Sequence, residues 1–176
     1  MVIRGLEIMD GSKNGKQMKD DQLHLSNQFC FPIYSVSRLI TKAYKPFLDK
    51  LGLTYPQYLV LMVLWENDGL SVNQITEKLL LNTNTLSPLL KRMEKMQLLQ
   101  RSRSIEDERS VIIRLTDDGK DLKTKALHIP EKLSAEILSD RIQMEDMIHL
   151  KDTLCELINV LDNKSDATDS SQKLTT

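Results

Sequence analysis

Residues 81–120 read LNTNTLSPLLKRMEKMQLLQRSRSIEDERSVIIRLTDDGK, and this stretch decides the fold. It opens on small polar residues that can cap a helix and leave its first turn uncluttered. Leucine and methionine then recur at helical spacing, with lysine and arginine between them. After Leu98 the period changes, because LLQRSRS alternates weakly and SVIIRLT is rich in β-branched residues. The charged segment IEDERS separates the two, so we predict a helix followed by a β-hairpin of about 17 residues.

Helices are predicted on both sides of this stretch. Apolar residues recur at helical spacing from Ile33 to Leu51, and Pro56 opens a second, strongly apolar helix. The segment SVNQITEKLLL predicts a short third helix. Thr116 is predicted to cap a further helix, and the chain beyond it is helical with a bend at Pro130. The fold class is therefore mainly α with a small β-hairpin wing, in the order of a winged helix-turn-helix.

The length of 176 residues fits one compact domain, predicted over residues 25–162. Residues 1–24 and 163–176 mix small polar and charged residues without periodicity, so we predict a flexible arm and a disordered tail. The apolar stripe of the last helix has to be buried, for which the first helix and a partner subunit are the expected surfaces. Within the domain we expect dimerisation helices over 28–51 and 117–162 and the winged helix-turn-helix over 56–116.

Several function classes do not fit the composition. The sequence has no apolar run of the length that a membrane span needs, and its polar N-terminus lacks the apolar core of a signal peptide. Two cysteines, Cys30 and Cys155, do not make a disulfide framework, so a reducing cytoplasm is the expected location. The three histidines lack metal-ligand spacing with either cysteine, and we therefore expect no metal and no cofactor.

The charge distribution indicates a local site for a polyanion. Residues 82–116 hold seven basic and four acidic residues, a net charge of +3, whereas residues 117–162 carry −5. A solvated charged face would carry the same pattern. A helix with a small polar start and a basic flank nevertheless suits the major groove, and an arginine on a hairpin suits the minor groove. The candidates for base-edge contact are Asn82, Thr83, Asn84, Thr85 and Ser87, and those for phosphate contact are Lys91, Arg92 and Arg101.

The quoted stretch resembles the MarR family of dimeric winged-helix transcription regulators. In that family a recognition helix runs into a wing with an Asp-x-Arg core, which Asp107 and Arg109 match here. The resemblance implies that Arg109 enters the minor groove from the wing tip and that Asp107 orients it. Arg101 and Arg103 complete the candidate wing contacts. The resemblance also implies a homodimer that binds double-stranded DNA at a pseudo-palindromic operator.

A second segment is similar to the organic-hydroperoxide-sensing branch of this family. A cysteine stands near the start of the first helix, and YKPFLDKLGLTYPQY follows it. In that branch the cysteine is the peroxide sensor, and tyrosines of the partner subunit donate hydrogen bonds to it. By motif position these would be Tyr44 and Tyr55, and Tyr34 lies one helical turn after Cys30.

The sensing hypothesis needs Cys30 to be a thiolate. An ordinary free thiol with a pKa near 8.5 is only a few per cent ionised at neutral pH, but a helix N-terminus and hydroxyl donors favour the anion. Pro32 indicates that the regular helix starts near residue 31 or 32, which leaves Cys30 at its positive end. The alternative is that Cys30, between Phe29 and Phe31, is a buried apolar residue.

Cys155 has two interpretations. Some members of the branch use a second cysteine to resolve the oxidised sensor as a disulfide, whereas others use a small thiol. Cys155 lies on the apolar stripe beside Leu154 and Leu157, so we predict a packing residue, with the resolving thiol as the alternative.

The sequence therefore predicts a repressor that senses organic hydroperoxide by oxidation of Cys30 and then releases its operator. A first alternative is a repressor of the same family that a small apolar or phenolic ligand releases without redox chemistry. A second is a thiol peroxidase, against which the wing hairpin and the missing alternation of strands and helices argue, so we expect no enzyme.

Overall fold

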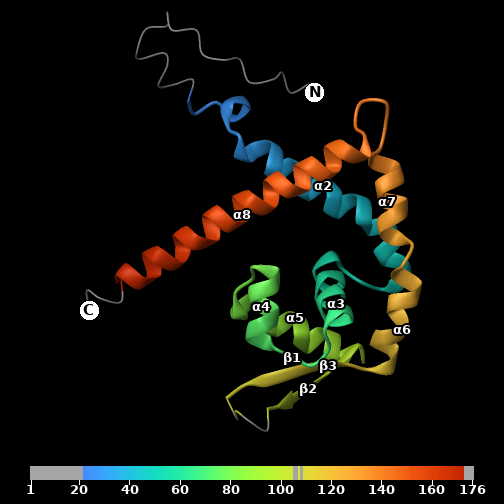
Figure 1. Ribbon diagram of the computed structural model, residues 1–176. Helices are drawn as coiled ribbons and strands as arrows, with labels where there is room; N and C mark the ends of the chain where they lie inside the picture. Colours follow the sequence, from blue (N-terminus) through green and yellow to red (C-terminus); the bar gives the residue numbers. More distant parts are fainter. Residues whose placement is uncertain (1–21, 105–106, 108, 173–176) are drawn as a thin grey trace, which may run out of the picture. The chain divides into compact units, whose positions relative to one another are not determined.

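The computed structural model describes residues 22–104, 107 and 109–172. Their contacts divide the chain into two compact units, residues 1–129 and 130–176, where the sequence predicts a single domain over 25–162. The division follows a break in the helical backbone at Leu127 and His128, just before Pro130, whose ring lacks the N–H that a continuous helix would use. Figure 1 shows the order of the elements along the chain.

The first long helix is α2, Cys30–Leu48, with the short 3₁₀ helices η1, Leu25–Asn27, before it and η2, Asp49–Leu51, after it. Pro32 lies in the first turn of α2, where a missing N–H costs little. The helix begins at Cys30, one or two residues earlier than predicted, and the predicted place of this cysteine at the positive end of a helix is confirmed.

The second helix, α3, Tyr55–Glu66, begins after a capping box. The side chain of Gln57 accepts a hydrogen bond from the backbone N–H of Thr54 at 2.8 Å, and Pro56 occupies the first turn, as predicted. Apolar side chains face nearly every direction of this helix, so it is buried within the first unit.

The helix-turn-helix consists of α4, Val72–Leu79, and α5, Thr83–Lys95. Ser71 caps α4 by accepting a hydrogen bond from the Gln74 N–H at 3.2 Å. Leu80 turns the chain between the two helices with a φ of 51°, in the left-handed region.

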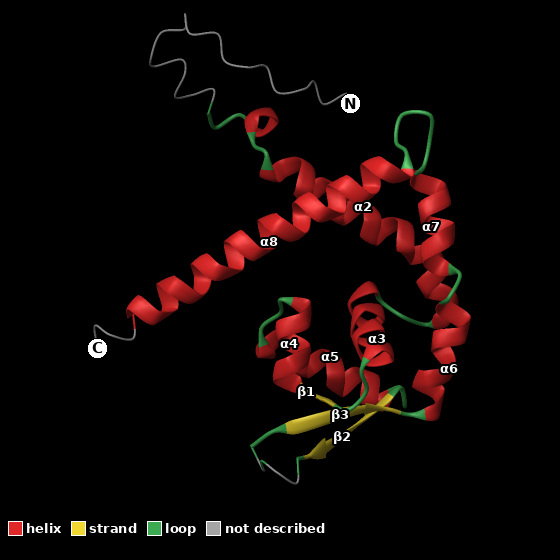
Figure 2. Cartoon of the chain, in the orientation of Figure 1, coloured by secondary structure: helices red, strands yellow, loops and turns green. Residues whose placement is uncertain are grey.

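The wing belongs to an antiparallel sheet of three strands in the order β1-β3-β2: β1, Leu70–Ser71, β2, Leu99–Arg103, and β3, Val111–Leu115. The hairpin of β2 and β3 is the predicted one, and it lies at one end of the α3–α5 helices (Figure 2). The sequence did not predict β1. Asp68 supports its pairing with β3, because the carboxylate accepts a hydrogen bond from the Leu115 N–H at 2.9 Å.

One apolar core joins these elements. The stripe predicted on α5 is confirmed, since its leucines and Met93 are buried against α3, α4 and the sheet. The largest fully buried side chains of this core are Leu48, Val60, Leu61, Leu64, Ile75, Leu86, Leu90, Met93, Leu99, Ile113 and Ile129.

Helix α6, Asp117–Ala126, begins at Thr116, which caps it as predicted by accepting a hydrogen bond from the Gly119 N–H at 3.1 Å. Gly119 is held very close to the end of α5, because a Cβ on it would lie 2.0 Å from the Leu98 carbonyl oxygen. The indole of Trp65 donates to the Gly119 carbonyl at 2.9 Å. Only glycine fits at this position.

Two further helices follow, α7, Ile129–Ile137, and α8, Met144–Gln172. Helix α8 continues ten residues past the point where the sequence predicts the disordered tail to begin. Once a helix is nucleated, each added residue gains a backbone hydrogen bond without a new nucleation cost, so a polar segment can extend it. Residues 173–176 of the predicted tail and residues 1–21 of the predicted arm lie outside the described residues.

We predict that Gly119→Ala destabilises the protein by about 1–3 kcal/mol, because the added methyl group cannot fit beside the Leu98 carbonyl. Gly52→Ala is the comparison: nothing lies within 4 Å of its Cβ position, so its cost comes only from the positive φ of 68° and is about 1 kcal/mol. Thermal unfolding at one fixed protein concentration measures both. Equal midpoints for the two variants would contradict the close approach.

Candidate functional site

The first turn of α5 presents small polar side chains to solvent. Thr83 and Asn84 are exposed there, and Ser87 is half-buried. Asn82 is the cap: its side-chain oxygen accepts hydrogen bonds at 2.9 Å from both the N–H and the hydroxyl of Thr85. Two of the five candidate base-contacting residues therefore already hold the helix start in place.

The basic flank of α5 is exposed on the side away from the core. Lys91 and Arg92 are both exposed, whereas the leucines of the same helix are buried. A polar first turn, a basic flank and a buried apolar stripe are the arrangement that an inserted recognition helix requires.

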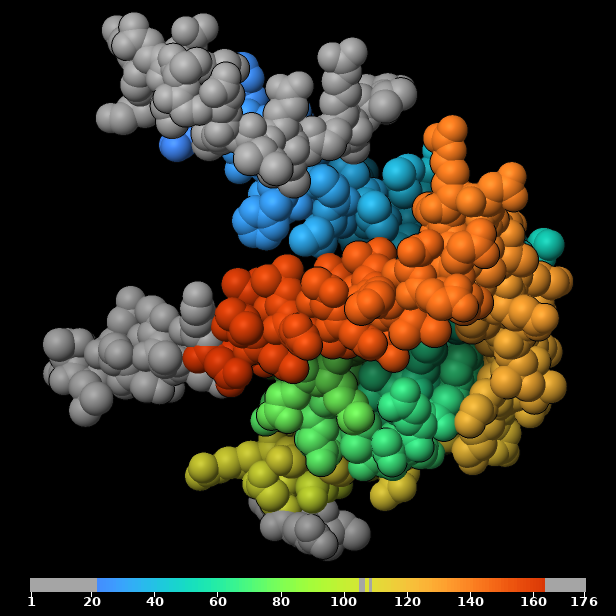
Figure 3. Space-filling model, turned by 45° about the horizontal axis from the view of Figure 1, so that its top comes forward, coloured from blue at the N-terminus to red at the C-terminus, as the bar shows by residue number. Residues whose placement is uncertain are grey.

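Asp107 organises the tip of the wing. One carboxylate oxygen accepts from the Arg109 backbone N–H at 3.0 Å, and the other accepts from the Ser110 hydroxyl at 2.6 Å. These bonds, the Ser110 hydroxyl foremost, lower the pKa of Asp107 below its usual value of 3.8. Arg103 and Arg109 are exposed. The wing forms a projection, coloured yellow in Figure 3, beside the green helices of the first unit.

Arg101 was expected to contact phosphates, but in the structure it is paired with Glu94. Its Nε donates to the Glu94 carboxylate at 2.8 Å, and its backbone N–H donates to the other oxygen of the same carboxylate at 3.3 Å. Glu94 was not among the predicted site residues. The sequence does single it out, because Glu94 is the one acidic residue between Asn82 and Ser104, within an otherwise basic stretch.

Cys30 is exposed as the first residue of α2. Phe29 before it is also exposed and Phe31 is half-buried. Cys30 therefore lies outside the apolar core of this chain. The alternative interpretation, in which it is a buried apolar residue, does not hold for the single chain.

The tyrosines divide into two groups. Tyr44 of α2 packs against Tyr55 and Tyr58 of α3, with ring centroids 4.9 and 5.7 Å apart, and Tyr58 contacts Trp65 edge-on at 6.0 Å. Tyr34 stands outside this cluster, with the Arg38 guanidinium 5.6 Å from its ring. Tyr58 was not predicted as a site residue, although its place three residues after Tyr55 puts both on one face of α3.

Burial raises the pKa values of the tyrosines in this cluster. The pKa of Tyr44 rises to about 12, and the neighbouring Tyr55 and Tyr58 add to the effect. Burial also raises the pKa values of Tyr55 and Tyr58. A tyrosine hydroxyl is protonated at neutral pH even at its ordinary pKa, and the upward shifts keep these three hydroxyls available as hydrogen-bond donors at higher pH as well.

The structure does not bring Cys30 to this cluster within one chain. Cys30 and Tyr44 are the first and fifteenth residues of the same helix, and a rise of 1.5 Å per residue separates them by about 21 Å along its axis. Tyr34, in contrast, is one turn away from Cys30.

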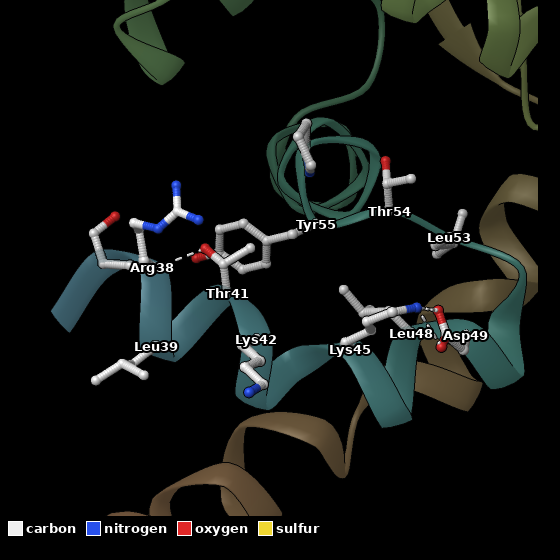
Figure 4. A pocket seen from close by; sticks show the side chains of 12 residues that line it. Arg38, Leu39, Thr41, Lys42, Lys45, Leu48, Asp49, Leu53, Thr54 and Tyr55 are labelled. Atoms are coloured by element: carbon white, nitrogen blue, oxygen red, sulfur yellow. Dashed lines mark hydrogen bonds and ion pairs between the residues drawn. The ribbon is translucent and has the colours of Figure 1, made fainter. Parts of the chain in front are cut away.

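A cavity of about 830 Å³ lies between α2 and the start of α3. Figure 4 shows Tyr55 reaching from α3 toward α2, beside Arg38 and Thr41. Leu39, Leu48 and Leu53 line part of the wall, and Lys45 is paired with Asp49 at 2.7 Å. The cavity thus combines an apolar wall, a phenol and basic side chains, a combination that fits an amphipathic molecule.

Cys155 is exposed on α8, between the half-buried Leu154 and Leu157. Its role as a packing residue or as a resolving thiol stays a prediction. Among the described residues, no group of histidine, cysteine and acidic side chains could hold a metal ion. None of the helices in the described part of the chain is both long and apolar enough to cross a membrane.

The known proteins to which this chain is similar are transcriptional regulators. A family profile described as "Transcriptional regulator SarA/Rot" matches residues 42–126. The organic hydroperoxide resistance transcriptional regulator of Bacillus subtilis (strain 168) is 50% identical over 147 residues, which cover 84% of this chain and 98% of that protein.

Two solved structures of the regulator AbfR are also similar. The structure of reduced AbfR bound to DNA has a TM-score of 0.68 and 38% identity, covering 83% of this chain and 98% of that one. The structure of disulfide-formed AbfR has a TM-score of 0.54 at the same identity, covering 81% and 98%.

We predict that the wing tip responds to acid through Asp107. Because its pKa is lowered in the folded chain, its hydrogen bonds are intact above pH 3.8 and are lost as the pH falls through the lowered value. The amide proton resonance of Arg109 in an NMR titration should then shift, and Asp107→Asn should lose that shift. The amide of Arg114, within β3, is the control and should not respond.

Proposed function

Because this chain belongs to the MarR-type winged-helix transcriptional regulators, we propose that it binds operator DNA as a homodimer and releases it when an organic hydroperoxide oxidises Cys30. The observation that carries the proposal is an exposed cysteine at the first residue of α2, in a chain that is half identical to an organic hydroperoxide resistance regulator.

Each protomer would contact DNA at two places. The first turn of α5, with Thr83 and Asn84, enters the major groove, and Lys91 and Arg92 approach the phosphates on either side. The wing brings Arg109 to the minor groove. Binding weakens as salt rises, because each neutralised phosphate releases counterions.

Exposed apolar stripes support a second copy of the chain as the partner. On α2 and at Phe29 just before it, the side chains of Phe29, Ile33, Val36 and Leu39 are exposed at spacings of three and four residues. On α8, the exposed apolar residues include Met144, Ile148, Ile158 and Leu161. Such stripes require burial, and a two-fold homodimer matches a pseudo-palindromic operator.

The dimer would complete the sensor. About 21 Å along α2 separates Cys30 from Tyr44 of its own chain, so the donors to the thiolate come from Tyr44 and Tyr55 of the second copy. Both hydroxyls are protonated at neutral pH, and burial raises their pKa values further. A neutral donor stabilises the thiolate by a hydrogen bond and adds no competing charge.

The chemistry is a two-electron oxidation. The Cys30 thiolate attacks the terminal oxygen of the hydroperoxide, the O–O bond breaks, and the alkoxide leaves and takes up a proton to become an alcohol. The product is a sulfenic acid, which a second thiol converts to a disulfide with loss of water. Cys155 or a small thiol supplies that sulfur. The changed contacts at the dimer would then respace the two DNA-binding parts and release the operator.

The cavity beside Tyr55 favours a second candidate function. With about 830 Å³, an apolar wall and a phenol, it fits a small apolar or phenolic inducer that would release DNA without oxidation. Both mechanisms use the same DNA-binding surface, so only the role of Cys30 separates them.

The deciding experiment is a gel shift with a DNA duplex selected by the reduced protein, with and without cumene hydroperoxide. We expect the wild-type protein to release the duplex and Cys30→Ser to keep it. Cys155→Ser is the matched control, which removes the other thiol and should still respond if a small thiol is supplied. Release of Cys30→Ser by the peroxide would contradict the redox mechanism.

The tyrosines give a separate prediction. Tyr44→Phe and Tyr55→Phe, in a Cys155→Ser background, should each slow the oxidation of Cys30 about tenfold, because a hydrogen bond to a charged group is lost. Tyr58→Phe removes a hydroxyl from the same cluster and should leave the rate unchanged. Stopped-flow measurement of sulfenic acid formation gives the three rates. An equal effect of all three changes would point to packing and not to hydrogen bonding.

A further inference from the structure

Glu94 and Arg101 connect the end of the recognition helix to the base of the wing. Both oxygens of the Glu94 carboxylate contact the same residue, one at 2.8 Å from Arg101 Nε and the other at 3.3 Å from its backbone N–H. The two side chains are partly shielded, with 30% of Arg101 and 36% of Glu94 exposed. Both residues belong to the first unit.

The backbone contact matters because β2 is an edge strand. In the order β1-β3-β2, alternate N–H groups of β2 face away from β3 and need another partner. Glu94 supplies that partner for Arg101. The carboxylate therefore fixes the backbone of the wing, as well as one of its side chains, to α5.

The charge of Glu94 is unexpected on a surface for DNA. Lys91, Arg92 and Lys95 lie within three positions of it along α5, and an unpaired carboxylate among these basic residues would repel phosphates. Paired with Arg101, it offsets a positive charge that a phosphate would otherwise take up.

We propose that Glu94 is a positioning residue for DNA recognition, which holds Arg101 back from the phosphates and sets the wing at a fixed angle to the recognition helix. The proposal rests on the DNA-binding part of the proposed function and not on the peroxide chemistry. A fixed angle holds the major-groove contacts of α5 and the minor-groove contact of Arg109 at one spacing. Glu94 thus favours the correct site over general attraction to DNA.

The test is a double-mutant cycle on the reduced full-length protein: Glu94→Gln, Arg101→Gln and both together. Fluorescence anisotropy measures the affinity over a range of KCl concentrations for two duplexes, one selected by the wild-type protein and one of random sequence. The dependence of log affinity on log salt counts the phosphates that the protein neutralises.

We expect Arg101→Gln to lower the affinity for both duplexes alike, because it leaves the Glu94 carboxylate without its cation. It should leave the salt slope unchanged, because Arg101 is held by Glu94 and neutralises no phosphate in the wild-type protein. Glu94→Gln should steepen the slope by about 0.9 per protomer as Arg101 becomes available, and the double variant should return to the wild-type slope. Glu94→Gln should also reduce the preference for the selected duplex about tenfold, since a charge-assisted hydrogen bond to the wing is lost.

Three comparisons make the cycle specific. Glu77→Gln removes the same charge from an exposed site on α4 and should leave the preference between duplexes intact. Arg92→Gln should flatten the slope, as expected for a residue that contacts phosphate. Glu94→Asp keeps the charge but shortens the reach to Arg101, so it should lower the preference for the selected duplex as Glu94→Gln does. This second variant tests the same role if Glu94→Gln does not fold.

The role of Glu94 is overturned if Arg101→Gln flattens the slope as much as Arg92→Gln does, or if Glu77→Gln reproduces the whole effect of Glu94→Gln. Failure of the wild-type protein to bind either duplex would overturn the proposed DNA binding and this inference together. Normal binding with no coupling between Glu94 and Arg101 would overturn this inference alone.

Discussion

The close approach of Gly119 to the Leu98 carbonyl is the constraint on which the rest of the first unit depends. Thr116 donates its hydroxyl to the Gln97 carbonyl at 2.5 Å and its N–H to the Leu98 carbonyl at 3.2 Å. The indole of Trp65 donates to Gly119 from the end of α3. Four segments therefore meet at one point: the residues that follow α5, the end of β3, the start of α6 and the end of α3. A side chain at this point would push them apart, so the glycine sets where the wing leaves the recognition helix.

The aromatic side chains connect this junction with α2. Tyr44 contacts Tyr58, Tyr58 contacts Trp65, and Trp65 bonds to Gly119. Lys123 of α6 also donates to the Trp65 carbonyl at 3.0 Å, so α3 and α6 are joined in both directions. Under the proposed function, the phenols that would hold the thiolate are thus in contact with the residues that fix the recognition helix. Under that proposal, a change at the tyrosines has a continuous route of packed side chains to the DNA-binding surface.

Local signals in the sequence were enough for most of the fold. Thr116 and Pro56 mark helix starts because capping and the missing N–H act within one turn. Cys30 at the start of α2 followed from Pro32 for the same reason. In contrast, β1 has two residues and exists only through its pairing with β3, so no periodicity in the sequence could indicate it. The pair of Glu94 and Arg101 also escaped prediction, because the two residues are seven positions apart and the chain changes from helix to strand between them.

The residues of the proposed sensor site divide in the same way into those that the sequence indicates and those that only the packing determines. The sequence indicated the cysteine, the tyrosines and the start of α2. It did not indicate the distances between the thiol and the phenols, because the packing of α2 against α3 decides which tyrosines form a cluster. That packing places the phenols near one end of α2 and the thiol at the other. Under the proposed function, a single chain would not complete the thiolate site, whereas a two-fold pair of antiparallel α2 helices would bring each thiol to the other's phenols. The same two-fold pairing would present two recognition helices to DNA, so sensing and operator binding would depend on a single assembly.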